Sequence, residues 1–396
     1  TTYCVRTFMK LFQRLLVAPA TLGLFAPLAV NATEVNLNAI SDYSDDQIEL
    51  DSNSFKSFST EKSLLISGGE GLVDDYSSDS FSTTTSASFS ADFAVGFVDG
   101  GTRDATNGDT DDQVNAGYGF QIDLNTSFTG EDSFDVSLDA GSTDATGYTE
   151  FDLNDASETL TVDGISYTFP VAGATVMVGD SMDGSSLFTV ACAYGTPSDT
   201  MDACGTPSAV FAGLGSATVA ASYDFDNGFS VSGGYQGEGD NTDGLMTQEG
   251  ADAFGANVAY TTDTFGVSFS SAVIEDTNGV DDTYNGINAY WTPNGFPTFS
   301  VGYEKGDVGS AAGVVDGRTM YFLGAQFEEV GPGTLGVAAG TKTATVEGSD
   351  ELMMYEAFYD YPLNDSMTIT PLVFIKEFGA GTEDEFGVMA KTSFSF

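Results

Sequence analysis

The sequence has 396 residues, of which 59 are Asp or Glu, 11 are Lys or Arg and none is His, so its formal net charge is −48. This balance argues against nucleic acid and anionic lipid headgroups as partners, and it fits either solubility in salty surroundings or a selective electrostatic role. The lack of His removes Ser–His and Cys–His catalysis and His-ligated metal centres. We therefore predict no enzyme activity, no cofactor and no metal centre.

The amino-terminal region predicts export. From Met9 to Ala32, a basic start with Lys10 and Arg14 is followed by an apolar stretch that ends in small residues. This is the composition of a secretory signal peptide, with cleavage expected after Ala32. Residues 1–8 precede it and receive no role, and residues 33–79 are expected to form a short periplasmic segment.

The rest of the chain alternates between apolar and polar side chains. Eight positions from Val114 to Phe128 keep a period of two, which a helix with its period of 3.6 does not produce. The run exceeds the usual strand length of about 5–6 residues and fits the roughly 9–11 that cross a bilayer. Sixteen such segments are predicted: Phe81–Phe97, Val114–Phe128, Phe134–Ala140, Ile165–Val171, Ala174–Val178, Ala217–Phe225, Phe229–Tyr235, Phe254–Tyr260, Phe265–Val273, Ile287–Trp291, Phe299–Tyr303, Tyr321–Phe327, Leu335–Ala339, Tyr355–Tyr361, Met367–Ile375 and Phe386–Phe396.

Short and long connections follow one another along these segments. The short ones are Thr129–Asp132, Asp226–Gly228, Thr262–Thr264, Pro293–Gly295, Gly331–Gly333 and Pro362–Asp365. The long ones are acidic: Asp99–Asp112, Gly237–Gly250, Glu275–Asp282 and Gly306–Gly317. Tight turns at one end and long loops at the other are typical of a transmembrane β-barrel.

Aromatic residues stand beside the short turns, as an interfacial girdle requires. They are Phe128, Phe225, Phe229, Tyr260, Phe265, Trp291, Phe296, Phe327 and Tyr361. Phe394 and Phe396 belong to the same girdle and to a predicted C-terminal assembly signal, with the last strand pairing with the first. The fold class is thus all-β: a transmembrane antiparallel barrel over residues 80–396, with about 16 strands, short periplasmic turns and long acidic outer loops. A soluble β-sandwich or solenoid would also alternate, but it would not gather long loops and aromatics at opposite ends.

Four stretches also resemble a known family. The amino terminus MKLFQRLLVAPATLGLFAPLAVNATEVNLNAISDYS and the segments Ile122–Gly141, Ile165–Gly179 and Phe327–Gly340 are similar to cyanobacterial outer-membrane porins, which are grouped with carbohydrate-selective (OprB-type) porins. The resemblance implies a trimeric barrel in the outer membrane that passes ions and small solutes, and some members are described as iron-uptake porins. The family usually carries an S-layer-homology module and a coiled coil before the barrel. Residues 33–80 contain no heptads, so peptidoglycan attachment does not follow from the resemblance.

The alternation also assigns the two faces of the wall. If the Phe-bearing face meets lipid, the polar face, which includes Gln121 and Gln326, lines a water-filled lumen. The predicted pore-lining charges are Asp92, Asp123, Asp135, Asp139, Asp224, Glu304, Glu328, Glu356 and Asp360, with Lys376 and Lys391 as the only bases on that face.

A constriction is predicted in the longest barrel loop, residues 180–215. It holds four acids, Asp180, Asp183, Asp199 and Asp202, and no base, together with Cys192 and Cys204, which are expected to form a disulfide in an exported protein. Folded into the lumen, this loop would favour cations; as an outer loop, it would only stiffen the rim. Acidic outer runs such as Gly239–Gly244 offer oxygen ligands for Ca²⁺, but without a full spaced set.

The function predicted from these features is a porin for passive diffusion of ions and small hydrophilic solutes, with a preference for cations. Its expected partners are outer-membrane lipid, further copies of itself in a homotrimer, and the solutes. The alternative is a non-conducting structural or adhesive barrel whose acidic loops bind ions.

Overall fold

The computed structural model describes residues 85–100, 114–142, 150–151, 153, 159–211, 217–238, 244–247, 250–276, 280–309, 315–346, 348–379 and 381–396. The predicted extension, signal peptide and periplasmic segment lie outside these ranges, as does nearly all of Gly239–Gly244. No helix in the described part of the chain is long and apolar enough to cross a membrane.

The described residues form one sheet of seventeen strands. The strands are β1 (Thr85–Asp99), β2 (Val114–Thr126), β3 (Ser133–Gly141), β4 (Thr161–Val171), β5 (Ala174–Asp180), β6 (Ala217–Asp224), β7 (Phe229–Gly237), β8 (Asp252–Thr261), β9 (Phe265–Asp276), β10 (Val280–Trp291), β11 (Thr298–Gly309), β12 (Val315–Val330), β13 (Gly333–Thr341), β14 (Thr345–Val346), β15 (Met353–Asn364), β16 (Met367–Lys376) and β17 (Glu385–Ser395).

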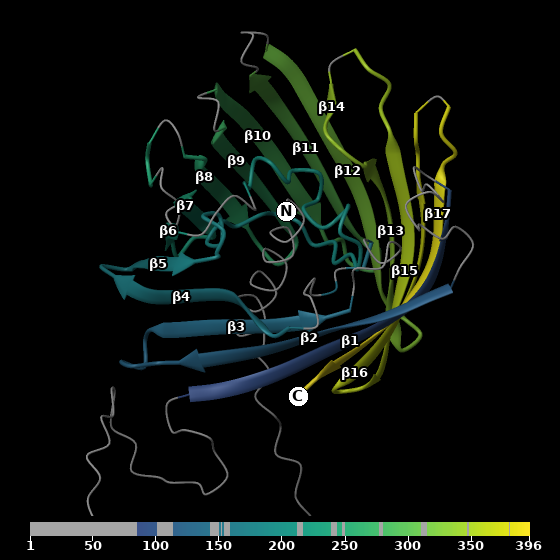
Figure 1. Ribbon diagram of the computed structural model, residues 1–396, viewed down its shortest axis with the longest axis horizontal. Coiled ribbons are helices and arrows are strands. Elements are labelled where there is room, and N and C mark those ends of the chain that lie inside the picture. The colour runs from purple at the N-terminus through teal and green to yellow at the C-terminus, as the bar shows by residue number, and fades with distance from the viewer. Residues whose placement is uncertain are drawn as a thin grey trace, which may run out of the picture.

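The sheet closes into a barrel. Neighbouring strands are antiparallel, and β17 pairs with β1 from Ser90 opposite Ser395 to Asp99 opposite Phe386. The two residues of β14 pair with β12, as β13 does, while β13 itself pairs with β15. β14 therefore continues β13 at the same position in the sheet, and the closed barrel has sixteen strand positions (Figure 1). The fold class and the sixteen predicted strands are confirmed, although the first of them begins outside the described residues.

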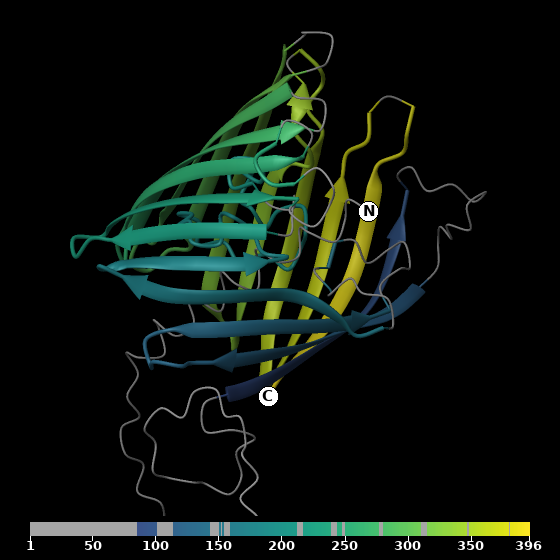
Figure 2. The same ribbon diagram turned by 60° about the vertical axis from the view of Figure 1, so that its left-hand side comes forward.

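The two ends of the barrel differ as predicted. All six short connections join neighbouring strands, and a seventh, Ala172–Gly173, joins β4 to β5. Ala172 has a φ of 51° and Gly173 a φ of 87°, the backbone that a two-residue hairpin turn requires and that glycine adopts without strain. The long connections leave from the opposite end of the strands (Figure 2).

The outer face of the wall is apolar. Phe93 (55% exposed), Leu323 (57%) and Trp291 (57%) belong to a set of Val, Ile, Leu, Phe and Tyr side chains that recur at every second position around the barrel. So much contiguous exposed apolar surface is unfavourable in water and suits lipid contact.

Aromatic rings touch one another beside the short turns. Tyr260 lies between Phe229 (4.7 Å between ring centroids) and Phe265 (5.8 Å). Phe396 stacks on Phe89 across the closing pair of strands at 5.9 Å, and the two residues exchange backbone hydrogen bonds of 2.8 and 3.0 Å. The closing ladder therefore continues to the girdle.

A charge on the outer face should cost stability. Leu323 lies midway along β12 and points outward. Leu323→Arg is expected to lower the free energy of unfolding in liposomes by about 2–4 kcal/mol, since the guanidinium would meet the bilayer centre. Urea titration of the folded fraction measures this cost. Asp92→Arg, on the inner face of β1, is the control and should lack it; an equal cost in both variants would contradict the assignment of faces.

Candidate pore constriction

Residues 181–211, which connect β5 towards β6, lie inside the barrel, and we call them the inner loop (Figures 1 and 2). Alternate backbone N–H groups of this loop donate to side chains on β9, β11 and β12. Ala191 donates to Ser268 Oγ of β9 (2.8 Å), and Ala193 donates to Ser300 Oγ of β11 (3.0 Å). Gly195 donates to Gln326 Oε1 of β12 (2.9 Å). The wall thus satisfies backbone groups that would otherwise be buried without partners.

A second set of bonds holds the later part of the inner loop. The N–H of Ala209 donates to Glu304 Oε2 at 2.7 Å, and the hydroxyl of Thr206 bonds Asn288 Oδ1 at 2.9 Å. Asn288 in turn donates from Nδ2 to the carbonyl of Cys204 at 3.1 Å. β10 and β11 therefore hold residues 204–209 from the side.

Apolar packing completes the attachment. Tyr194 places its ring 5.3 Å from Phe322 and 5.7 Å from Phe358, within a buried cluster that also contains Met201. Phe211 packs at 5.7 Å against Phe188 in a second cluster. Dry cores of this kind, rather than hydrogen bonds alone, keep a loop inside a water-filled barrel.

Two glycines allow the inner loop to approach the wall. A Cβ atom on Gly234 would lie 1.6 Å from the carbonyl oxygen of Gly184, and one on Gly302 would lie 1.7 Å from that of Cys204. Neither position can carry any other residue without moving the loop.

A disulfide joins Cys192 and Cys204, twelve residues apart, with 6.4 Å between their Cα atoms. The bridge encloses Tyr194, Met201 and the hydroxyl pair of Thr196 and Ser198 (3.0 Å). A bond that closes a loop of this size contributes about 2–4 kcal/mol to stability.

The connection between β3 and β4 also contacts the inner loop, which the sequence analysis did not predict. Glu150 forms an ion pair with Lys376 of β16, and its Oε1 accepts from Thr200 Oγ1 at 3.1 Å. Its carbonyl accepts from the N–H of Asp199 at 3.0 Å. Phe151, next to it, is buried with the Tyr194 cluster. One Glu among 59 acids, in a loop without periodicity, gives no signal that could single it out.

Burial raises the pKa of Glu150 to about 7, because the charged carboxylate loses its hydration, and the ammonium of Lys376 offsets only part of this effect. Glu385 lies 3.8 Å from the same ammonium, and Asp199 faces Glu150 from the inner loop. Glu150 and Glu385 thus share the ammonium of Lys376, and Asp199 adds a further negative charge beside Glu150.

The predicted pore-lining residues all lie on the inner face, and all but Asp224 fall into three groups with different surroundings. The first group occupies the wall opposite the inner loop, since β1, β2 and β3 lie eight places from β9, β10 and β11 in the closed order. These acids are held by polar neighbours: Asp123 accepts from Ser137 (2.7 Å), Asp135 from Asn125 (2.6 Å) and Asp139 from Thr161 (2.9 Å). Asp92, on β1, belongs to the same group.

The second group anchors loops instead of facing water. Glu304 is 1% exposed and holds Ala209, while Glu356 accepts from Tyr194 (3.0 Å) and Thr196 (2.6 Å). Lys376 is paired with Glu150. These three positions were predicted as pore lining because alternation assigns a face and cannot show that a loop covers it.

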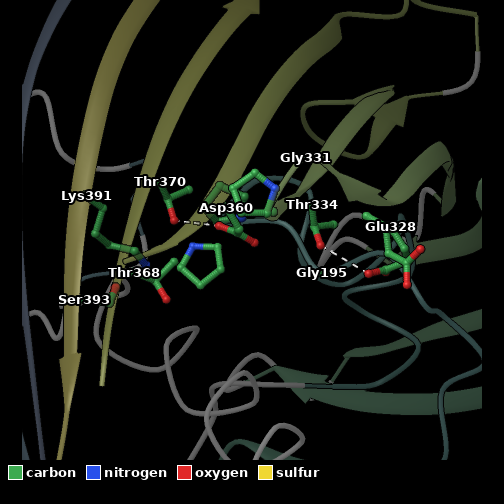
Figure 3. A pocket seen from close by; sticks show the side chains of 14 residues that line it. Gly195, Glu328, Gly331, Thr334, Asp360, Thr368, Thr370, Lys391 and Ser393 are labelled. Atoms are coloured by element: carbon green, nitrogen blue, oxygen red, sulfur yellow. Dashed lines mark hydrogen bonds between the residues drawn. The ribbon is translucent and has the colours of Figure 1, made fainter. Parts of the chain in front are cut away.

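The third group, Glu328, Asp360 and Lys391, lines a cavity of about 580 Å³ beneath the inner loop (Figure 3). Asp224 stays exposed at the short-turn end of β6. Arg318 also lies on the inner face, opposite Gly306 and two positions before Met320. It was missed because β12 starts six residues earlier than the predicted strand, at Val315 rather than Tyr321.

The four acids of the predicted constriction are spread along the inner loop. Asp180 is exposed at the end of β5, and Asp183 is 2% exposed. Asp199 and Asp202 lie within the disulfide-closed segment. Among the described residues, no three acidic or Cys side chains come close enough together to hold a metal ion.

Adding one methyl group at Gly234 should detach the start of the inner loop. Gly234→Ala would push Cβ into the carbonyl of Gly184, whereas Gly233→Ala meets no atom nearer than 3.5 Å. We expect faster proteolysis of the loop and a conductance per channel that differs from wild type only in Gly234→Ala. Limited proteolysis in detergent, read by mass spectrometry, compares the two; equal protection would show that the close approach does not hold the loop.

The raised pKa of Glu150 predicts a pH-dependent stability. A carboxyl group whose folded pKa exceeds its ordinary value of 4.5 contributes stability that is complete below pH 4.5 and is lost as the pH rises through about 7. Between these values, the free energy of unfolding of wild type should fall by up to about 3 kcal/mol relative to Glu150→Gln. Urea unfolding in detergent from pH 4 to 8 measures this difference. Glu383→Gln, an exposed site, serves as control, and parallel profiles for wild type and Glu150→Gln would refute the effect.

The comparison with solved structures identifies the fold. No protein-family model matches the chain, and no curated protein matches its sequence. Among solved structures, an anion-selective porin from Comamonas acidovorans superposes with a TM-score of 0.57 at 14% identity, over 79% of this chain and 99% of that one. The high-pH structure of Pseudomonas putida OprB gives 0.56 at 10% identity, over 79% and 94%. A mutant porin of Rh. blastica gives 0.52 at 17% identity, over 79% and 100%. The chain therefore has the fold of the bacterial porins.

Proposed function

We propose that this protein is an outer-membrane porin that lets ions and small hydrophilic solutes diffuse passively and favours cations. The observation that carries the proposal is the inner loop, which crosses the lumen of a closed barrel and is fixed to the wall from β8 to β15. A loop in this position narrows the channel to the space between itself and β1–β3. The acids Asp92, Asp123 and Asp135 line that remaining wall, whereas Asp139 is buried.

The charges of the lumen support a cation preference. Of the bases on the inner face, Lys376 pairs with Glu150, Lys391 is 9% exposed, and Arg318 lies near the long-loop end of β12, away from the acids of β1–β3. The free path is therefore lined mainly by carboxylates, which raise the local concentration of cations and repel anions. Screening over about 8 Å at physiological ionic strength would weaken this preference in salt.

The similar structures support the channel more than its selectivity. The Comamonas protein is described as anion-selective, and OprB belongs to Pseudomonas putida; both share the barrel with this chain at low identity. Membership of the cyanobacterial OprB-type porins, a homotrimer and export by the Met9–Ala32 signal are part of the proposal and rest on the sequence resemblance.

One observation favours a second candidate, a non-conducting structural barrel. The Tyr194 cluster, which includes Phe151, fills the lumen beside β1, β12, β15, β16 and β17 with a dry core. A barrel filled in this way over its whole section would not conduct, so single-channel recording separates the two candidates.

The test is the reversal potential of the chain from Thr33 in a planar bilayer across a KCl gradient. Discrete conductance steps with a reversal potential of the sign expected for cations are predicted. Asp123→Asn combined with Asp135→Asn should shift the reversal potential towards zero, whereas Asp263→Asn in a short turn should leave it unchanged. Steps with anion preference would overturn the selectivity, and a folded barrel without steps would overturn the channel.

A further inference from the structure

The cavity beneath the inner loop combines both signs of charge. Its roof is formed by Gly195 and Pro197 of the inner loop, and its walls come from β12, β13, β15, β16 and β17. The ammonium of Lys391 lies at one end of the cavity and the carboxylate of Glu328 at the other, with the carboxylate of Asp360 between them (Figure 3). Its volume of about 580 Å³ holds a small organic molecule with water.

Lys391 is the unusual member of this set. Its side chain is 9% exposed, and within the described ranges no side chain or carbonyl oxygen accepts a hydrogen bond from its ammonium. Its only recorded partner there is the ring of Phe151, 5.7 Å away, at the outer limit of a cation–π contact. The ammonium reaches the cavity that Lys391 lines, where an anionic group of a solute can pair with it.

On the opposite side of the cavity, β12 departs from a regular strand. The register of β12 shifts between Phe327 and Val330, and Glu329 has a φ of 57°. Because of this bulge, the consecutive residues Glu328 and Glu329 both line the cavity, which a regular strand would not allow. Bulges of this kind occur where a strand must aim a side chain.

The carboxylates are positioned by hydroxyl and amide donors. Asp360 accepts from Thr370 Oγ1 at 2.6 Å. Glu328 accepts from Gln326 Nε2 at 2.8 Å and from Thr334 Oγ1 at 3.2 Å, one donor on each oxygen. A carboxylate has about four acceptor sites, so Glu328 can still receive donors from a solute.

We propose that this cavity is a transient binding site for amphoteric solutes of amino-acid type, with the carboxylate of the solute at Lys391 and its cationic group at Glu328 and Asp360. A solute that carries only negative charge would meet the three acids of the cavity, and one that carries only positive charge would leave Lys391 unpaired. A molecule with both charges satisfies both sides at once. The proposal rests on the proposed channel function and specifies a solute class for it.

Blockade of the ion current tests the site with two related probes. L-Arginine carries a carboxylate, and agmatine is the same molecule without it. In the wild-type channel, arginine should interrupt the KCl current with a dissociation constant, extrapolated to zero voltage, about tenfold lower than that of agmatine, as expected for one charge-assisted contact. Lys391→Met should remove this difference, and Lys391→Arg should keep it. Lys305→Gln, an exposed lysine on the outer face, is the control.

The acidic side is tested separately. Glu328→Gln should weaken the block by both arginine and agmatine about equally, since it removes the contact with the cationic group. Equal block by the two probes in wild type, or stronger block by the uncharged sugar maltotriose than by arginine, would overturn the proposal while the KCl steps still support the channel. Absence of any KCl current would instead refute the channel function itself.

Discussion

The backbone pairing between β1 and β17 is the interaction on which the rest of this structure depends. A sheet with an apolar outer face cannot leave a row of N–H and C=O groups unpaired in lipid, since each such group costs several kcal/mol there. The ladder from Ser90–Ser395 to Asp99–Phe386 removes the last two edges. Closure also creates an inside, and only then do the polar faces of the strands acquire a shared space to line.

The inside is divided by the inner loop into a dry part and a wet part. On the dry side, wall residues such as Ser268, Ser300 and Gln326 serve the backbone of the loop, and aromatic rings fill the gaps. On the opposite wall, Asp123 accepts from Ser137 and Gln121, Asp135 accepts from Asn125, and Asp139 is buried. The same alternation of side chains therefore supplies anchors on one half of the barrel and a charged surface on the other.

This division explains how much could be predicted from the sequence. The period of two assigns each strand and each face, because it is a local property, and the strand segments, short turns and barrel follow from it. The burial of Glu304 and Glu356 could not be predicted, because it depends on where a loop about 95 to 160 residues away in the chain comes to rest. Glu150 was missed for the same reason, and Arg318 because the apolar pattern ends before the strand does.

The attachment of the inner loop has a consequence for the order of assembly. Its contacts reach progressively further along the chain: Ala191 to Ser268 spans 77 residues, Ala193 to Ser300 spans 107, Gly195 to Gln326 spans 131 and Tyr194 to Glu356 spans 162. Each must wait until its strand has joined the growing sheet, and contacts of such separation form slowly. The loop is therefore fixed strand by strand, and its final bonds form when the barrel is nearly complete. The final position of the inner loop is a late product of folding, set by strands that enter the sheet long after the loop itself.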